Sequence, residues 1–146
     1  MIVYLDSSVL ARAYLADEEG HEAALTLLFD PELVGVTGTW TRIEVSGALM
    51  RAARSGRGDA AGLLKLLEDD LSPEGPVTVI AMDQRRVESR ALELVREHAL
   101  RAMDAWHLAV AELAVPALAE KGEEIGFASR DDAQAAVAEQ LGFTPV

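Results

Sequence analysis

The sequence contains no cysteine, which excludes disulfide bridges and thiolate metal sites. It also lacks an apolar run long enough to span a membrane. Asp6 interrupts the N-terminal apolar run too early for a secretory signal peptide. These absences make the cytoplasm the expected location, with no membrane partner.

Basic residues are scarce as well. The chain has 13 Lys and Arg against 25 Asp and Glu, and a formal net charge of −12. Such a balance opposes binding of a nucleic acid through bulk electrostatics. Lys65 and Lys121 are the only lysines, and the remaining bases are arginines. Arginine suits bidentate phosphate contacts, although a GC-rich genome would produce the same bias.

Half of the residues are hydrophobic and the mean hydropathy is +0.12, which is typical of a globular protein. The length favours a single domain over residues 1–146. Strand-like runs alternate with helical patterns, which predicts an α/β fold with a parallel sheet. The predicted strands cover residues 2–5, 33–37, 77–80 and 125–129, and residues 143–146 are compatible with a short edge strand. The predicted helices cover about 7–15, 21–29, 39–54, 60–70, 84–98, 105–114 and 130–141, and Pro116 is expected to perturb the end of the sixth.

The N-terminal stretch places an acid directly after a strand. Ile2 to Leu5 form an unbroken apolar run, which is typical of a strand buried on both faces. Asp6 follows at once, and Ser7-Ser8 open a helix. Ligands of open α/β sheets bind at the carboxyl ends of strands, so Asp6 is a site candidate. The alternative is that Asp6 only starts the helix.

Three other acids occupy comparable positions. Glu44 lies in the first turns of the helix after the second strand, Asp104 lies at the start of an apolar helix, and Asp131 follows the fourth strand. All can reach the same edge of the sheet. The neighbours of Asp104 in the sequence are nearly all apolar, and we therefore favour a ligand role for Asp104 over a role as a helix cap. For Glu44, a role in the site and a place on the exposed face of the helix are equal alternatives.

The position of the fourth acid is open. Asp131 and Gln134 match a capping box, in which both side chains bond to backbone N–H groups at the start of a helix. Asp132 follows directly, so either aspartate is a candidate to face the site.

Carboxylates gathered in one pocket repel each other unless cations neutralise them. Mg²⁺ or Mn²⁺, which prefer oxygen ligands, are the natural counter-ions. Such a pocket is suited to phosphodiester hydrolysis. The sequence shows no Ser-His-Asp order, phosphate-binding glycine loop or zinc-ligand spacing that would favour another chemistry.

Four motifs carry a resemblance to a known family. They are Ile2-Val3-Tyr4-Leu5-Asp6-Ser7-Ser8, Thr41-Arg42-Ile43-Glu44-Val45, Leu100-Arg101-Ala102-Met103-Asp104-Ala105-Trp106-His107-Leu108-Ala109 and Phe127-Ala128-Ser129-Arg130-Asp131. With these motifs the chain resembles PIN domains, specifically the VapC-type ribonuclease toxins of toxin–antitoxin pairs. The resemblance covers nearly the whole chain.

This resemblance implies a three-layer α/β/α sandwich with a central parallel sheet. It implies an Mg²⁺- or Mn²⁺-dependent ribonuclease whose catalytic and metal-binding acids are Asp6, Glu44, Asp104 and Asp131. Ser8 would orient Asp6 or a metal-bound water, besides capping the helix. The implied partners are an RNA substrate, a small antitoxin protein and a second copy of the chain in a homodimer.

Two further residues are candidates near this site. Arg51 lies seven residues after Glu44, on nearly the same helix face and in a cluster with Arg54 and Arg57. A contact with an RNA phosphate or with an antitoxin carboxylate is therefore our hypothesis for Arg51. His107 follows Asp104 by three residues; a general base is one interpretation, but we favour a helix histidine bonded to nearby backbone.

Two other classes of function remain as alternatives. A phospho-acceptor or phosphatase domain of receiver type also gathers acids at strand ends. It needs a second acid beside the first or a lysine facing the pocket, and Ser7-Ser8 after Asp6 and the positions of Lys65 and Lys121 oppose it. A catalytically inert binding module, whose acids are only helix caps, is the other alternative.

Overall fold

The protein is described by a computed structural model that covers residues 1–146. Its centre is a five-stranded sheet in the order β3-β2-β1-β4-β5, and all neighbouring strands are parallel. The strands are β1 (Ile2–Leu5), β2 (Val34–Gly38), β3 (Val77–Ile80), β4 (Ile125–Ala128) and β5 (Thr144–Pro145). The predicted parallel sheet is therefore confirmed, and the C-terminal segment does add an edge strand.

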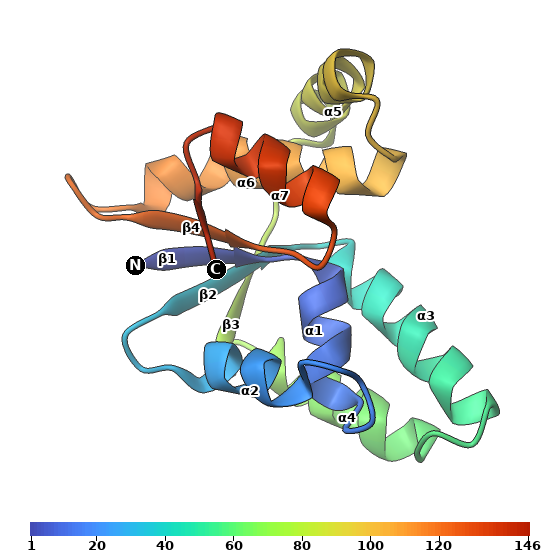
Figure 1. Cartoon of the computed structure of the whole chain (residues 1–146). Helices are drawn as coiled ribbons and strands as arrows, with labels where there is room; N and C mark the ends of the chain where they lie inside the picture. The colour runs from blue at the N-terminus through green and yellow to red at the C-terminus, as the bar shows by residue number, and fades with distance from the viewer.

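Seven helices cover the two faces of the sheet (Figure 1). On one face lie α1 (Ser7–Tyr14), α2 (His21–Phe29), α3 (Thr41–Arg54) and α4 (Ala60–Asp70). On the other lie α5 (Gln84–His98), α6 (Ala102–Leu118) and α7 (Asp132–Gln140). This arrangement is the three-layer α/β/α sandwich expected from the resemblance. None of the helices combines the length and the apolar character needed to cross a membrane.

The central strand β1 separates two hydrophobic cores. Ile2 and Tyr4 point into the core beneath α5, α6 and α7, whereas Val3 and Leu5 point into the core beneath α1 to α4. All four side chains are buried. The alternation along a strand thus buries both faces, which explains why this run of the sequence contains no charged residue.

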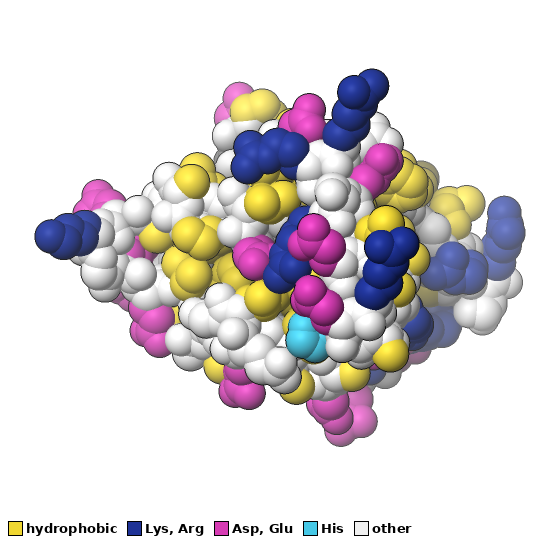
Figure 2. Space-filling view, turned by 90° about the horizontal axis from the view of Figure 1, so that it is seen from above, with side chains coloured by type: hydrophobic (Ala, Val, Ile, Leu, Met, Phe, Trp, Pro, Cys, Tyr) yellow, Lys and Arg dark blue, Asp and Glu magenta, His cyan; other side chains and the backbone are white.

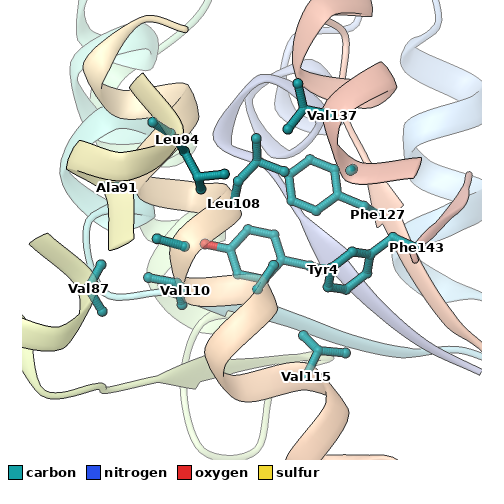
Figure 3. Packing of buried hydrophobic residues seen from close by; sticks show 14 of the residues in the cluster. Tyr4, Val87, Ala91, Leu94, Leu108, Val110, Val115, Phe127, Val137 and Phe143 are labelled. Carbon is teal, nitrogen blue, oxygen red and sulfur yellow. The ribbon is translucent and has the colours of Figure 1, made fainter. Parts of the chain in front are cut away.

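Tyr4 is the centre of an aromatic group in the first core (Figure 3). Its ring stacks on that of Phe127, with centroids 5.3 Å apart and an interplanar angle of 6°. Phe143 packs edge-on against Phe127. The hydroxyl of Tyr4 accepts a hydrogen bond from the backbone N–H of Gly38 at 3.1 Å, so this buried polar group is satisfied.

The sixth helix is longer than predicted. It begins at Ala102 rather than Ala105 and continues past Pro116 to Leu118. Pro116 lies in the last turn, where only one intrahelical hydrogen bond is lost, and the N–H of Ala119 still bonds to the carbonyl of Val115. The predicted limits of this helix, Ala105 and about Ala114, were therefore wrong, and Asp104 lies within the first turn rather than before it.

Candidate active site

The four predicted acids Asp6, Glu44, Asp104 and Asp131 all line one pocket of about 500 Å³. The pocket lies at the carboxyl edge of the sheet, where the neighbouring strands β1 and β4 end. After β1 the chain enters α1 on one face, and after β4 it enters α7 on the opposite face (Figure 1). Such a divergence opens a crevice between the two strand ends, which is where ligands of α/β sheets bind.

Asp6 is both a helix cap and a pocket residue. Its Oδ2 accepts hydrogen bonds from the backbone N–H of Ser8 at 3.0 Å and from the Ser8 hydroxyl at 2.6 Å. Its Oδ1 lies 3.6 Å from Nε2 of His107. Asp6 is only 4% exposed, so these contacts fix the orientation of its carboxylate. The two alternatives for Asp6 are thus compatible, and Ser8 holds Asp6 in place.

Glu44 is held by a histidine from the core. Its Oε2 lies 2.5 Å from Nε2 of His107, and the Nδ1 of the same ring lies 2.8 Å from the hydroxyl of Tyr4. A neutral imidazole with its proton on Nε2 satisfies this chain, because it donates to Glu44 and accepts from Tyr4. The hypothesis that His107 bonds to nearby backbone was therefore wrong. Its partners come from β1 and α3 and could not be read from α6 alone.

Asp104 and Asp131 are bridged by an arginine that the sequence reasoning did not select. Nε of Arg101 lies 2.7 Å from Oδ2 of Asp104, and its Nη2 lies 2.5 Å from Oδ2 of Asp131. The hydrogen bond to Asp104, followed by the charges of the two carboxylates, raises the pKa of Arg101. The side chain of Arg101 is 74% exposed, against 18% for Asp104 and 32% for Asp131. The guanidinium therefore covers the two acids from the solvent side without sealing them off.

The fourth acid of the pocket is Asp131 rather than Asp132. Oδ1 of Asp131 caps α7 by accepting hydrogen bonds from the backbone N–H groups of Ala133 and Gln134, both at 3.0 Å. Oδ2 remains directed to Arg101. Asp132 is exposed and does not line the pocket. Asp131 can therefore act as a cap with one oxygen and face the pocket with the other.

Gln134 is a second residue that the sequence reasoning misassigned. It does not complete a capping box; the backbone N–H of Asp131 instead donates to the hydroxyl of Ser129. The Gln134 side chain is fully buried, where its amide nitrogen donates to the backbone carbonyl of Asp104 at 3.1 Å and lies 3.5 Å from Oδ1 of Asp6. Gln134 thus links α7 to two segments that carry pocket acids.

The pocket has the right donors for a divalent ion but not a formed coordination site. No three His, Asp or Glu side chains lie in an arrangement that would hold a metal ion as they stand. The four predicted acids therefore share one pocket, but their carboxylates do not converge on a single point. The donors are carboxylates, which suit Mg²⁺ or Mn²⁺, and the guanidinium of Arg101 already supplies positive charge between Asp104 and Asp131. The pocket residues therefore fit a hard cation that replaces the Arg101 guanidinium between Asp104 and Asp131.

Arg51 does not line the acid pocket. It lies on the exposed side of α3 and lines an adjoining groove, together with Arg57 but without Arg54. The predicted cluster of three arginines is thus only partly formed, and a contact of Arg51 with substrate stays a prediction.

The fold and the pocket define an α/β/α sandwich with four acids at the switch point of its sheet. The sequence model of the PIN domain matches residues 3–140, and the chain therefore belongs to the PIN domain family. Among solved structures, it is similar to the crystal structure of VapC20 from Mycobacterium tuberculosis, a Sarcin-Ricin loop cleaving toxin. The two share 22% sequence identity with a TM-score of 0.65, over 99% of this chain and 98% of VapC20. At this identity the likeness establishes the fold. No curated protein sequence gives a match.

Proposed function

We propose that the chain is a metal-dependent endoribonuclease that acts as the toxin of a toxin–antitoxin pair. The observation that carries the proposal is the meeting of four acids from four separate segments in one solvent-accessible pocket. Membership of the PIN family and the likeness to VapC20, itself an RNA-cleaving toxin, support it. A small antitoxin protein and a homodimer are the partners expected from the VapC resemblance.

In the proposed reaction Asp6, Glu44, Asp104 and Asp131 would hold Mg²⁺ or Mn²⁺. When bound, the ions supply positive charge that activates water and stabilises the charge developing on the phosphate. Ser8 orients Asp6 through two hydrogen bonds. His107 orients Glu44. A bound ion would take the place of the Arg101 guanidinium, which now lies between Asp104 and Asp131.

The receiver-type alternative is weakened by the residues of the pocket. The only cations that line it are Arg101 and Arg130, and neither Lys65 nor Lys121 reaches it. Ser7 and Ser8 occupy the positions where a second acid would follow Asp6. The pocket thus lacks both features that a phospho-acceptor site requires.

The test is the loss of RNA cleavage in Asp6→Asn and Asp104→Asn. Asparagine removes one negative charge but caps a helix as well as aspartate does, so Asp6→Asn should fold. Asp104 lies within the first turn of α6 and caps no helix, so Asp104→Asn removes no cap and should fold as well. Asp132→Asn is the matched control, because Asp132 is exposed and lies next to a pocket acid but outside the pocket. Cleavage in the presence of Mg²⁺ or Mn²⁺, and toxicity on expression, should disappear in the first two variants and persist in the control. Full toxicity of Asp6→Asn would show that the assignment is wrong.

A titration with Mn²⁺ separates the nuclease from an inert binding module. Binding of the ion to the native state must raise the melting temperature by mass action. We expect a rise for the wild-type protein and for Asp132→Asn, and a much smaller rise for Asp104→Asn. An unchanged melting temperature of the wild type at millimolar Mn²⁺ would favour the inert module.

A further inference from the structure

A groove of about 340 Å³ adjoins the acid pocket and has the opposite charge. Ser8 and Arg130 line both hollows, so the two meet at these residues. The groove is lined by three further arginines, Arg12, Arg51 and Arg57. They come from α1, from α3 and from the loop after α3, and only the tertiary structure brings them together. We call this hollow the arginine groove.

Part of its positive charge is already neutralised. Glu18 is the only acid that lines the groove. Arg57 donates to Oδ2 of Asp17 at 2.6 Å and to Oε1 of Glu18 at 2.7 Å, and Arg130 donates to Oε2 of Glu18 at 3.2 Å. The hydrogen bonds from Arg57 are the main reason that the pKa values of Asp17 and Glu18 are lowered. These two acids therefore hold Arg57 and Arg130 in position.

Arg12 and Arg51 form no ion pair with an acid. Neither has a carboxylate oxygen within 4.0 Å, whereas Arg57 and Arg130 both do. Nε of Arg12 is buried without any hydrogen-bond partner. Burial, followed by repulsion from Arg130, lowers the pKa of Arg12. The groove thus holds a surplus of positive charge from arginines that no acid pairs, and this surplus is the feature of an anion site.

This local surplus contrasts with the rest of the molecule. The net charge is −12, and on the face seen in Figure 2 acidic and basic side chains lie interspersed rather than in one broad basic surface. A polyanion therefore cannot bind through the overall field and needs a confined cationic site. The arginine groove is such a site, and an RNA strand lying in the acid pocket would run into it past Ser8 and Arg130.

We propose that the arginine groove binds the RNA phosphate next to the one that is cleaved in the acid pocket, with Arg12 and Arg51 as its contacts. This inference rests on the proposed ribonuclease function. Phosphate fits the groove because its oxygens can accept paired hydrogen bonds from planar guanidinium groups. The subsite explains how a strongly acidic protein binds RNA, and it sets the direction in which the strand leaves the pocket.

The test is the salt dependence of RNA binding. The affinity for a labelled single-stranded ribo-oligonucleotide is measured at several salt concentrations, in an Asp6→Asn background that keeps the probe intact. Arg51→Gln and Arg12→Gln should each weaken binding and reduce the slope of log affinity against log salt by about 0.7, the value for one lost phosphate contact on a single strand. Arg85→Gln, which removes an exposed charge from α5, is the matched control and should leave the slope unchanged.

A variant that should bind RNA more tightly controls for effects that come only from a loss of folding. Glu18→Gln removes the one acid that lines the groove and weakens its bonds to Arg57 and Arg130. It should bind the same probe more tightly than the background protein does. A misfolded protein would not produce this gain.

The outcomes separate this proposal from the nuclease assignment. An unchanged salt slope in Arg51→Gln and Arg12→Gln, with an intact probe, would overturn the groove proposal alone. Displacement of the probe by oligoglutamate as efficiently as by unlabelled RNA would also overturn it, in favour of an acidic protein segment. Degradation of the probe by the Asp6→Asn protein would instead count against the nuclease assignment, and the slopes would then be measured in the presence of a chelator.

Discussion

Nε2 of His107 lies 2.5 Å from Oε2 of Glu44, although 63 residues separate them along the chain. The imidazole is 1% exposed and is held on its other side by the hydroxyl of Tyr4. The aromatic core beneath α6 is thus connected through one histidine to a carboxylate of the pocket. We therefore predict that His107 is a positioning residue, because it contacts an acid of the pocket.

Replacing His107 should impair the site more than it impairs folding. His107→Phe removes the donor to Glu44 and leaves the buried proton of the Tyr4 hydroxyl without an acceptor, which costs about 1–3 kcal/mol of stability. We expect affinity for Mn²⁺ to fall by about 10–100-fold, the usual effect of losing a residue that orients a metal ligand. Mn²⁺ affinity is measured by calorimetry. His107→Gln, whose amide can still donate to Glu44, should lose less affinity for Mn²⁺ than His107→Phe does. Equal affinities in the two variants would contradict a positioning role.

Replacing Arg101 should have the opposite effect on metal binding. A cation that enters the pocket must displace the guanidinium from Asp104 and Asp131. Without that competitor, Arg101→Gln should bind Mn²⁺ several-fold more tightly in the same calorimetric measurement. Arg86→Gln, which removes an exposed charge from α5, is the control and should match the wild type. Weaker binding by Arg101→Gln would mean that Arg101 supports the metal site and does not compete with it.

The two tyrosines should titrate only when the protein unfolds. Burial, and next the charge of Asp6, raises the pKa of Tyr4 well above its ordinary value of 10.0. Burial, and next the charge of Asp70, raises that of Tyr14. In the unfolded chain both phenols lose their protons near pH 10, whereas in the folded protein they keep them, so the free energy of unfolding falls as the pH rises above about 10.

Absorbance of tyrosinate, followed together with circular dichroism on raising the pH, checks this prediction. The two signals should change in the same transition. Tyr14→Phe should reduce the amplitude of the absorbance change by half, because the chain has two tyrosines. Phenol ionisation centred near pH 10 in a protein that is still folded would contradict the predicted shifts.

Two glycine substitutions should change stability in opposite directions. A Cβ at Gly38 would lie 2.7 Å from the ring of Trp106 and 2.9 Å from the hydroxyl of Tyr4. Both side chains are packed, so Gly38→Ala should lower the free energy of unfolding by about 1–3 kcal/mol. A Cβ at Gly47, inside α3, would meet only the flexible end of Arg51 at 3.2 Å. Gly47→Ala should therefore raise the free energy of unfolding by about 0.5–1 kcal/mol, as expected for alanine in a helix.

Denaturant unfolding of the two variants measures these differences. An equal or higher stability of Gly38→Ala would show that Trp106 and Tyr4 can move apart at little cost. This would also weaken the view that the Tyr4 hydroxyl is rigidly held between Gly38 and His107.

The sequence by itself determined the secondary structure, the parallel sheet and the candidate acids. The helices over residues 21–29, 60–70 and 84–98 and the strand over 77–80 were predicted at their observed limits. These features are local, because the spacing of apolar residues and the acid after a strand reflect only the backbone conformation and which face is buried. The helix around Pro116 was misjudged because the packing of its apolar face outweighs one lost hydrogen bond.

The tertiary structure decided the contacts that give the site its character. His107 meets Glu44, Arg101 bridges to Asp131, Gln134 reaches Asp6, and each pair joins elements that are distant along the chain. The arginine groove is likewise hidden in a sequence with a net charge of −12. Composition sums charges over the whole chain, whereas attraction between a pocket and its ligand depends on the few charges that the fold brings within several ångströms of each other.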